Sequence, residues 1–255
     1  MPPGPAPAAP AVLTAAEIDA VVFDLGGVFM IPDPARIAEI LAAAGVHVEY
    51  DAVDGYRAHS AGVRALTELF AGDHGDESDA DVWRAYDLAY FATVGLDGDT
   101  LARAANARDE YRRSPARVGH VWLQPLTDNI ATLPAIAERR PVAIVSNNDG
   151  TAADQCLDLG IAQVGAGPHT PVAALVDSGV VGVAKPDPRI FEPALEALGT
   201  DAARTLYVGD TVHADVRGAT AAGMPVVQLD PHELHDDHDH WRLPDLAALV
   251  AVLDA

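Results

Sequence analysis

The hydrophobic residues of this chain follow two alternating patterns. Short apolar runs have the length of buried strands, and each is followed by polar residues or glycine. Between them, apolar residues three or four positions apart predict helices. The predicted strands are residues 20–23, 141–146, 172–176, 205–208 and 225–229, and the predicted helices of the same region are residues 130–136, 151–159, 188–198, 214–222 and 243–253. This alternation predicts an α/β fold with a mostly parallel sheet covered on both faces.

One long segment lacks the alternation. From residue 50 to about residue 118 the apolar positions recur at helical spacing, and no run has the character of a strand. We therefore predict an inserted α-helical subdomain over residues 32–120 and a core formed by residues 17–31 and 121–255. Residues 1–16 are rich in proline and alanine and lack the basic region of a secretory signal, so we expect a disordered tail there.

The amino-acid composition argues against some classes of binding partner. The 38 acidic residues outnumber the 16 basic ones and give a formal charge of −22, which argues against binding to nucleic acid or to an anionic membrane surface. No apolar run approaches the ~18 residues of a membrane span. The single cysteine, Cys156, is typical of a reducing compartment, and we expect a cytoplasmic protein. In a chain of this charge, an anionic substrate would need a metal ion and a few well-placed cations.

Polar side chains follow the predicted strands at their carboxyl ends. Because these ends lie along one edge of a parallel sheet, residues far apart in the sequence can converge there. Lys185 precedes a helix whose proline-rich start fixes its direction. Two glycines after Asp24 let backbone N–H groups approach an anion closely. The candidate residues are Asp24, Ser146, Asn147, Lys185, Asp210 and Asp215.

These residue types suit phosphate chemistry around a metal ion. The carboxylates of Asp24 and Asp210 are hard oxygen ligands of the kind that bind magnesium. Lys185 and the Ser146 hydroxyl would hold phosphoryl oxygens. A carboxylate can also act as the nucleophile and form an aspartyl-phosphate that water then hydrolyses. Taken one at a time, each residue also has an explanation as a helix cap, a turn or a surface charge.

The same residues lie in four motifs that resemble, in order, those of the haloacid dehalogenase superfamily. The motifs are Phe23-Asp24-Leu25-Gly26-Gly27-Val28, Val145-Ser146-Asn147, Lys185-Pro186-Asp187-Pro188-Arg189-Ile190-Phe191, and Val208-Gly209-Asp210-Thr211 with Asp215. The resemblance covers about residues 20–230. It implies a Rossmann-like core, a helical cap over the active site and magnesium-dependent hydrolysis of a small phosphorylated substrate.

The resemblance also implies a role for each motif residue. Asp24 would be the nucleophile and a metal ligand, with the backbone carbonyl of Gly26 and the carboxylate of Asp210 as further metal ligands. Asp215 would orient either Lys185 or a metal-bound water. The residues expected to bind phosphate are Gly27, Ser146, Asn147 and Lys185.

One position departs from the family pattern. Phosphatases of this superfamily usually carry a second aspartate two residues after the nucleophile, where it protonates the leaving group, and this chain has Gly26. General acid catalysis of that kind is typically worth ~10²–10⁴ in rate. A phosphatase remains our preferred interpretation, because the reaction can proceed if the leaving group is good, as in an acyl or anomeric phosphate, or if the cap or a water molecule takes the role of the missing aspartate. The alternatives are a phosphate-binding or regulatory protein with little turnover, and a 2-haloacid dehalogenase.

Three further sets of residues allow both a functional and a structural interpretation. The histidines between His232 and His240 suggest either a transition-metal site or a solvated loop, and we prefer the loop. Arg57, His59 and Arg64 either face an anionic substrate or lie exposed on a helix, and we leave them out of the predicted site. Aromatic residues of the helical segment and its end are interpreted as hydrophobic core. They are Trp83, Tyr86, Tyr90, Phe91 and Trp122.

Overall fold

The computed structural model describes residues 13–71, 80–114 and 120–255. Most of the predicted disordered tail, residues 1–12, lies outside the described residues. Short 3-10 helices occur at Ala15–Glu17, Pro188–Phe191 and Ala202–Arg204. No helix in the described parts of the chain is long and apolar enough to cross a membrane.

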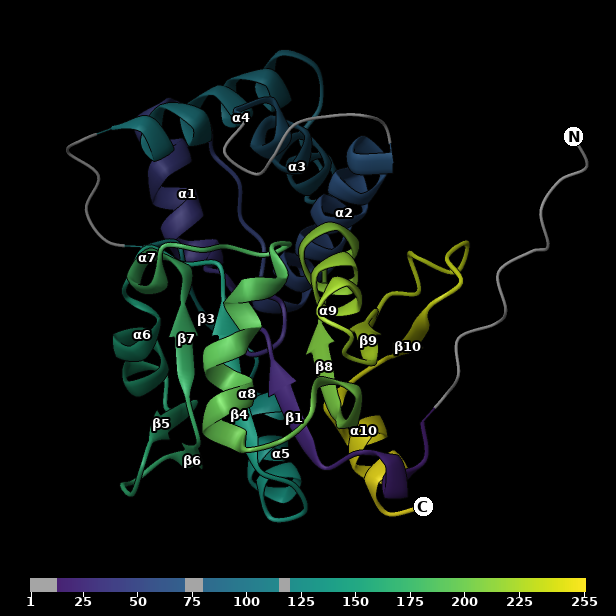
Figure 1. The fold of residues 1–255 in the computed structure, drawn as a ribbon. Coiled ribbons are helices and arrows are strands. Elements are labelled where there is room, and N and C mark those ends of the chain that lie inside the picture. Colours follow the sequence, from purple (N-terminus) through teal and green to yellow (C-terminus); the bar gives the residue numbers. More distant parts are fainter. Residues whose placement is uncertain (1–12, 72–79, 115–119) are drawn as a thin grey trace, which may run out of the picture.

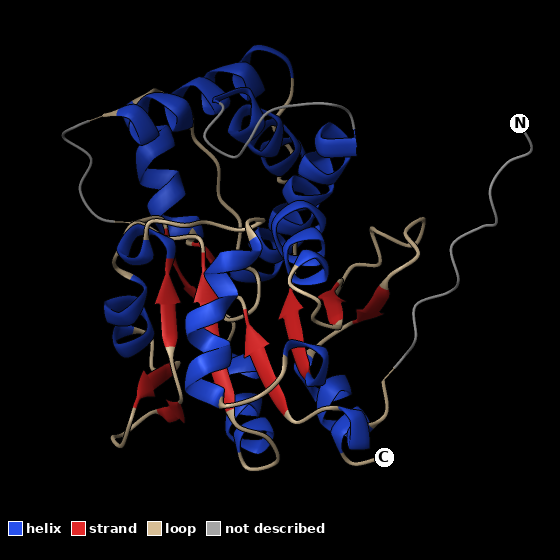
Figure 2. Ribbon diagram, in the orientation of Figure 1, coloured by secondary structure: helices blue, strands red, loops and turns tan. Residues whose placement is uncertain are grey.

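A six-stranded sheet forms the centre of the molecule (Figures 1 and 2). Every neighbouring pair in it is parallel, in the order β10-β9-β8-β1-β4-β7. The α/β class and the mostly parallel sheet predicted from the sequence are thereby confirmed. The first strand of the chain lies inside the sheet, and all four of its residues are buried. The strands are β1 (Ala20–Phe23), β4 (Val142–Ser146), β7 (Leu175–Asp177), β8 (Thr205–Gly209), β9 (Val226–Leu229) and β10 (Trp241–Leu243).

Helices cover both faces of this sheet, and successive residues of β1 point to opposite faces. Val21 and Phe23 belong to one hydrophobic cluster, which also contains residues of α5 and α10. Val22 belongs to the cluster on the other face, with residues of α8 and α9. The core helices are α5 (Thr127–Ala137), α6 (Ala152–Asp158), α7 (Ser178–Val181), α8 (Glu192–Leu198), α9 (Arg217–Ala221) and α10 (Leu246–Leu253).

Four helices gather at the end of the molecule beyond the carboxyl ends of the strands, at the top of Figure 1. They share a hydrophobic cluster of their own, which includes Leu41 from the first helix, Phe70 from the second and Tyr90 from the third. We refer to them as the α1–α4 layer. Its members are α1 (Pro34–Ala43), α2 (Ala52–Ala71), α3 (Ala80–Thr93) and α4 (Gly98–Arg113). The subdomain limits at residues 32 and 120 stay a prediction.

Several short elements differ from the predicted pattern. The predicted single strand at residues 172–176 is wrong, because β6 (Thr170–Val172) ends where it was to begin and β7 starts three residues later. A short parallel pair joins β6 to β5 (Ala162–Val164). An antiparallel pair, β2 (Met30–Pro32) with β3 (Trp122–Pro125), connects the α1–α4 layer to the core. The helix predicted at residues 214–222 begins as a π-helix, Val212–Val216.

The histidine-rich segment before β10 packs against α2, so the solvated-loop interpretation is wrong for part of it. His235 is buried, and its Nε2 lies 3.1 Å from the Thr67 hydroxyl. His232 Nδ1 lies 2.9 Å from the Ser60 hydroxyl. Among the described residues, these histidines do not form a group that could hold a metal ion. The segment therefore joins the core to the α1–α4 layer.

Candidate active site

The structure brings three carboxylates and one lysine together at the carboxyl ends of β1 and β8. Carboxylate oxygens of Asp24, Asp210 and Asp215 all lie within 4.8 Å of one another, and the three residues are buried. Lys185 Nζ lies 2.7 Å from Asp24 Oδ1 and 2.8 Å from Asp215 Oδ1. Ser146, at the end of β4, lines the same pocket. Because β1 pairs with both β4 and β8, three strand ends bring Asp24, Ser146 and Asp210 to one place.

Burial and charge act against each other on these groups. Burial raises the pKa of Asp24 above its ordinary value, although Lys185 opposes the change. Burial alone would lower the pKa of Lys185, but the carboxylates of Asp215 and Asp24 raise it overall. Burial alone would raise the pKa of Asp215, but the positive charge of Lys185 and the hydrogen bonds from Lys185 and Thr211 lower it overall. Lys185 therefore keeps its proton.

Asp215 uses both carboxylate oxygens on protein groups. Its Oδ1 accepts hydrogen bonds from Lys185 Nζ and from the Tyr207 hydroxyl, each at 2.8 Å. Its Oδ2 accepts from the backbone N–H and the hydroxyl of Thr211, at 2.9 and 2.6 Å. A Cβ at Gly209 would lie 2.3 Å from the Asp215 carboxyl carbon, so the strand needs a glycine there. Of the two predicted partners of Asp215, the contact that the structure contains is Lys185.

Two residues expected to bind phosphate have their polar groups engaged elsewhere. The Gly27 N–H, which the phosphate role would need, donates to the Met30 carbonyl at 2.8 Å. A Cβ on Gly27 would lie 2.1 Å from Asp210 Oδ2, and its φ is +67°, so this position requires glycine for packing. The Asn147 side chain accepts from the Lys185 N–H at 2.7 Å and donates to the Lys185 carbonyl at 3.0 Å. Asn147 therefore positions the backbone that carries Lys185.

The space beside Gly26 contains an aromatic ring. A Cβ at Gly26 would lie 3.2 Å from Cζ3 of Trp122, closer than most real contacts of this kind. Trp122 comes from β3, at the junction between core and α1–α4 layer, and lines the pocket. A larger residue at position 26 would have to displace this ring. The departure from the family pattern is therefore matched by packing around it.

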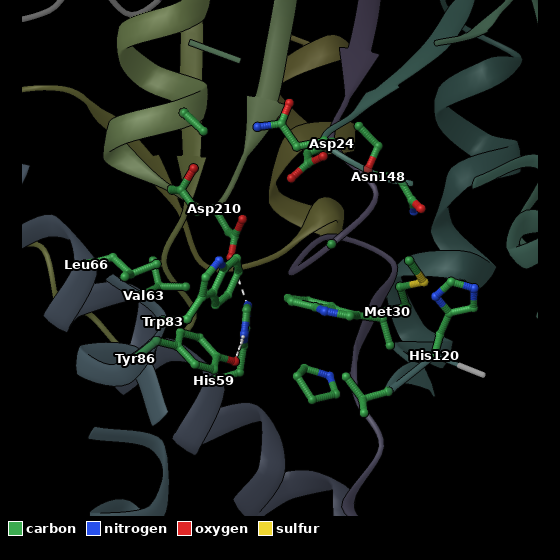
Figure 3. Close-up of a pocket in the computed structure, with 18 of the residues that line it drawn as sticks. Asp24, Met30, His59, Val63, Leu66, Trp83, Tyr86, His120, Asn148 and Asp210 are labelled. Atoms are coloured by element: carbon green, nitrogen blue, oxygen red, sulfur yellow. Dashed lines mark hydrogen bonds and ion pairs between the residues drawn. The ribbon is translucent and has the colours of Figure 1, made fainter. Parts of the chain in front are cut away.

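His59, which we left out of the predicted site, lies inside it (Figure 3). Its side chain is buried, with Nε2 2.9 Å from Asp210 Oδ2 and Nδ1 2.8 Å from the Tyr86 hydroxyl. The helical spacing contained a signal, because His59 lies on the buried stripe of α2 with Gly55, Gly62 and Leu66.

Arg57 and Arg64, which we considered together with His59, lie elsewhere. Arg57 pairs with Asp54 one turn before it on the exposed side of α2. Arg64 pairs with Glu68 and Asp237. Neither arginine lines the pocket that contains His59.

The pocket between the core and the α1–α4 layer has a volume of about 370 Å³. Carboxylates, Lys185 and Ser146 line its core side, and Arg108 and Arg112 line the side formed by α4. The interpretation of the aromatic residues as core is confirmed for Tyr86, Tyr90 and Phe91, which are buried in the α1–α4 cluster. Tyr86 also lines the pocket, together with Trp83 and Trp122, which are partly buried against the hydrophobic clusters; Figure 3 shows Trp83 and Tyr86.

The donor set fits a hard divalent cation. Asp24 and Asp210 offer buried carboxylate oxygens close together, and Asp215 adds a third negative charge nearby. Lys185 is the one lysine in the sequence, and its single positive charge leaves these three carboxylates undercompensated. Oxygen ligands with excess negative charge are the environment that magnesium prefers. Asp24 and Asp210 are the residues that could hold it, because both oxygens of Asp215 are engaged.

Comparison with known proteins agrees with this architecture. A model of the haloacid dehalogenase-like hydrolases matches residues 18–223. The chain is 30% identical over 178 residues to glyceraldehyde 3-phosphate phosphatase of Methanopyrus kandleri, covering 66% of this chain and 72% of that enzyme. It is 38% identical over 106 residues to phosphoserine phosphatase of Thermus thermophilus, covering 42% of this chain and only 41% of that enzyme.

Solved structures share the fold at low sequence identity. The putative hydrolase YfnB of Bacillus subtilis, solved with magnesium bound, superimposes with a TM-score of 0.56 at 15% identity, covering 93% of this chain and 99% of that one. A 2-haloacid dehalogenase of Pseudomonas syringae gives a TM-score of 0.51 at 21% identity, covering 93% and 98%. Both likenesses show a shared fold.

Proposed function

Because the chain belongs to the haloacid dehalogenase-like hydrolases, we propose that it is a magnesium-dependent phosphatase that acts on a small phosphorylated metabolite through an aspartyl-phosphate. The observation that carries this proposal is the contact of Lys185 with both Asp24 and Asp215, beside Asp210. It combines a nucleophile, a cation for phosphoryl oxygens and a second oxygen ligand. The phosphatases of Methanopyrus and Thermus among its relatives support the same reaction.

In the first step, a carboxylate oxygen of Asp24 attacks phosphorus in line with the ester oxygen. A bond forms between Asp24 and phosphorus, and the bond from phosphorus to the ester oxygen breaks. Lys185 and the Ser146 hydroxyl hold the phosphoryl oxygens, while Asp215 keeps Lys185 in place. Water then attacks phosphorus, releases inorganic phosphate and restores the Asp24 carboxylate.

Asp24 and Asp210, with the Gly26 carbonyl, would hold magnesium. When bound, the ion supplies positive charge that offsets the charge of the phosphoryl oxygens. We propose that the α1–α4 layer is the cap of the site, because its helices supply His59, Trp83, Arg108 and other walls of the pocket. The small phosphorylated substrate would lie between this layer and the core.

The leaving group receives no proton from position 26. Gly26 has no side chain, and the ring of Trp122 lies 3.2 Å from the position at which a Cβ would begin. His59 is held by Asp210 and Tyr86. We therefore propose substrates whose leaving groups need little protonation, such as acyl or anomeric phosphates. The same packing favours the alternative of a phosphate-binding protein with little turnover, which stays open to test.

Phosphate release from acetyl phosphate, glucose 1-phosphate and p-nitrophenyl phosphate, with and without magnesium, tests this proposal. We expect hydrolysis that requires magnesium and is abolished in Asp24→Asn, whose fold is checked by circular dichroism. The matched control is Asp158→Asn, an exposed residue of α6 that should keep the wild-type rate. A wild-type rate in Asp24→Asn would refute the nucleophile. Phosphate binding without hydrolysis of any ester would favour the binding protein.

A further inference from the structure

Arg108 is a buried guanidinium that lines the pocket, and two of its three nitrogens have no hydrogen-bond partner among the described residues. The residue is 5% exposed, and among the described residues neither its Nε nor its Nη1 makes a hydrogen bond. Burying a charged donor without a hydrogen-bond partner destabilises the folded state, and it does so by more than burying an unpaired neutral donor. Such a group in the wall of a pocket indicates that something absent from the free protein pairs with it.

The nearest carboxylate does not satisfy the arginines of α4. Asp87 of α3 accepts a hydrogen bond from Arg112 Nη2, whereas Arg108 Nε lies 3.9 Å from Asp87 Oδ1. Arg112 Nη1 is also buried without a hydrogen-bond partner among the described residues. Two guanidinium groups thus share one carboxylate, and burial raises the pKa of Asp87 to about 6 although Arg112 and Arg108 oppose the change. This wall has excess positive charge in a strongly acidic protein.

The guanidinium groups of the two arginines lie over aromatic rings. The guanidinium carbon of Arg112 lies 5.8 Å from the centre of the Trp83 ring, and that of Arg108 lies 5.9 Å from the centre of the Tyr111 ring. Both rings also line the pocket. A cation–π contact of this kind uses no N–H group in a hydrogen bond, so Arg108 Nε and Nη1 and Arg112 Nη1, which have no partner among the described residues, keep their donor capacity for a planar or tetrahedral anion.

We propose that Arg108 and Arg112 form a second anion subsite, so that the substrate is a phosphate ester carrying another anionic group, either a carboxylate or a second phosphate. This inference rests on the proposed phosphatase function and narrows its substrate class. The scissile phosphate would meet Asp24 and Lys185 on the core side, and the second anion would meet α4. A pocket of about 370 Å³ suits a metabolite of this size.

Pairs of esters that differ only in the second anion test the subsite. The carboxylate pair is glucuronic acid 1-phosphate with glucose 1-phosphate, and the phosphate pair is glucose 1,6-bisphosphate with glucose 1-phosphate, because these anomeric phosphates have the good leaving groups proposed above. We expect the wild type to prefer the anionic member of at least one pair, and the pair identifies the anion. In Arg108→Met the ratio of the two kcat/KM values should fall about ten- to hundred-fold, because charge-assisted hydrogen bonds are lost. A wild type that favours neither anionic member would overturn the subsite.

The variants distinguish a binding role from a structural one. Met keeps much of the apolar stem of Arg108 and removes a buried charge, two of whose nitrogens have no hydrogen-bond partner among the described residues, so the melting temperature should rise while the ratio falls. Arg113→Met on the exposed side of α4, where Arg113 pairs with Asp109, should leave the ratio unchanged. If Arg108→Met does not fold, Arg108→Lys and Arg112→Met take its place. Retention of the wild-type ratio in the folded Arg108 and Arg112 variants would refute the proposal.

A binding measurement separates this inference from the proposed function. Calorimetry with magnesium present compares 3-phosphonopropionate with propylphosphonate, which phosphatases cannot hydrolyse. Tighter binding of 3-phosphonopropionate that is lost in Arg108→Met would support a carboxylate subsite even if no ester were hydrolysed. Equal binding of the two phosphonates, together with no preference in the bisphosphate pair, would overturn the subsite even if hydrolysis were fast.

Discussion

The contact between Gly26 and Trp122 leads to a quantitative prediction. In Gly26→Asp, the new Cβ would begin 3.2 Å from Cζ3 of Trp122, with Cε3 and Cη2 at 3.6 and 3.7 Å. The ring has to move by a few tenths of an ångström, and the carboxylate then needs room beyond the Cβ. Overpacking of this kind typically costs about 1–3 kcal/mol. We expect Gly26→Asp to lose stability of that order and to gain little activity, because the ring blocks the carboxylate.

Removal of the ring should reverse both effects. In the Trp122→Leu background, we expect Gly26→Asp to cost less than about 1 kcal/mol, since mutations in contact are non-additive. The added carboxylate can then protonate a poor leaving group, and hydrolysis of alkyl phosphates should rise by up to ~10²–10⁴ relative to Trp122→Leu alone. Esters with good leaving groups should gain much less.

Urea unfolding of the four proteins in this cycle gives the coupling free energy. The rates of a series of aryl and alkyl phosphates, plotted against the pKa of the leaving group, give the catalytic effect. A working acid makes this dependence shallower. If Gly26→Asp alone were as stable as the wild type and already hydrolysed alkyl phosphates faster, Trp122 would not be the obstacle and our reasoning would be refuted.

Three further predictions concern the same region and the segment before β10. Lys185→Met should lose all turnover and about 3–5 kcal/mol of stability in urea unfolding, because it leaves Asp24 and Asp215 as buried unpaired carboxylates; unchanged stability would contradict this pairing. Gly209→Ala should unfold at lower urea and lose activity, because its Cβ would lie 2.3 Å from the Asp215 carboxyl carbon, and activity at the wild-type level would contradict this account. Burial, with His238 and Arg242, lowers the pKa of His240 to about 4, so this histidine binds more protons in the unfolded state between about pH 6.5 and pH 4, and its contribution to stability should fall as pH falls through that window. The free energy of unfolding, measured in urea at several pH values across this range, should depend less on pH in His240→Gln. A variant of the exposed His47 should keep the wild-type dependence.

The core of the site could be predicted because its residues directly follow apolar runs. Asp24 comes directly after β1 and Asp210 directly after β8, and adjacent parallel strands place such residues side by side whatever the details of packing. Lys185 required the motif, since no strand precedes it directly. The backbone contacts of Gly27 and Asn147 could not be foreseen, because they depend on how two loops meet.

The walls of the pocket depended on tertiary packing that the sequence pattern does not encode. Helical spacing shows that one face of α2 is buried, but it does not show that His59 on that face meets Asp210. Arg108 lies on a helix with many charged residues, and its burial depends on how α3 and α4 meet. The short strands β5 and β6 were missed for a similar reason, because two three-residue strands carry too few residues for a period to appear.

The burial of Lys185 has a practical consequence for labelling experiments. Lys185 is the one lysine in the sequence, so its side chain carries the one amine of the chain besides the α-amino group. That side chain is 1% exposed. An amine-reactive reagent can therefore acylate a side chain of this protein at a single position, and only when that position is open to solvent. Mass spectrometry of the labelled protein over time would measure how often the site opens, and how far a bound ligand keeps it closed, without any engineered probe.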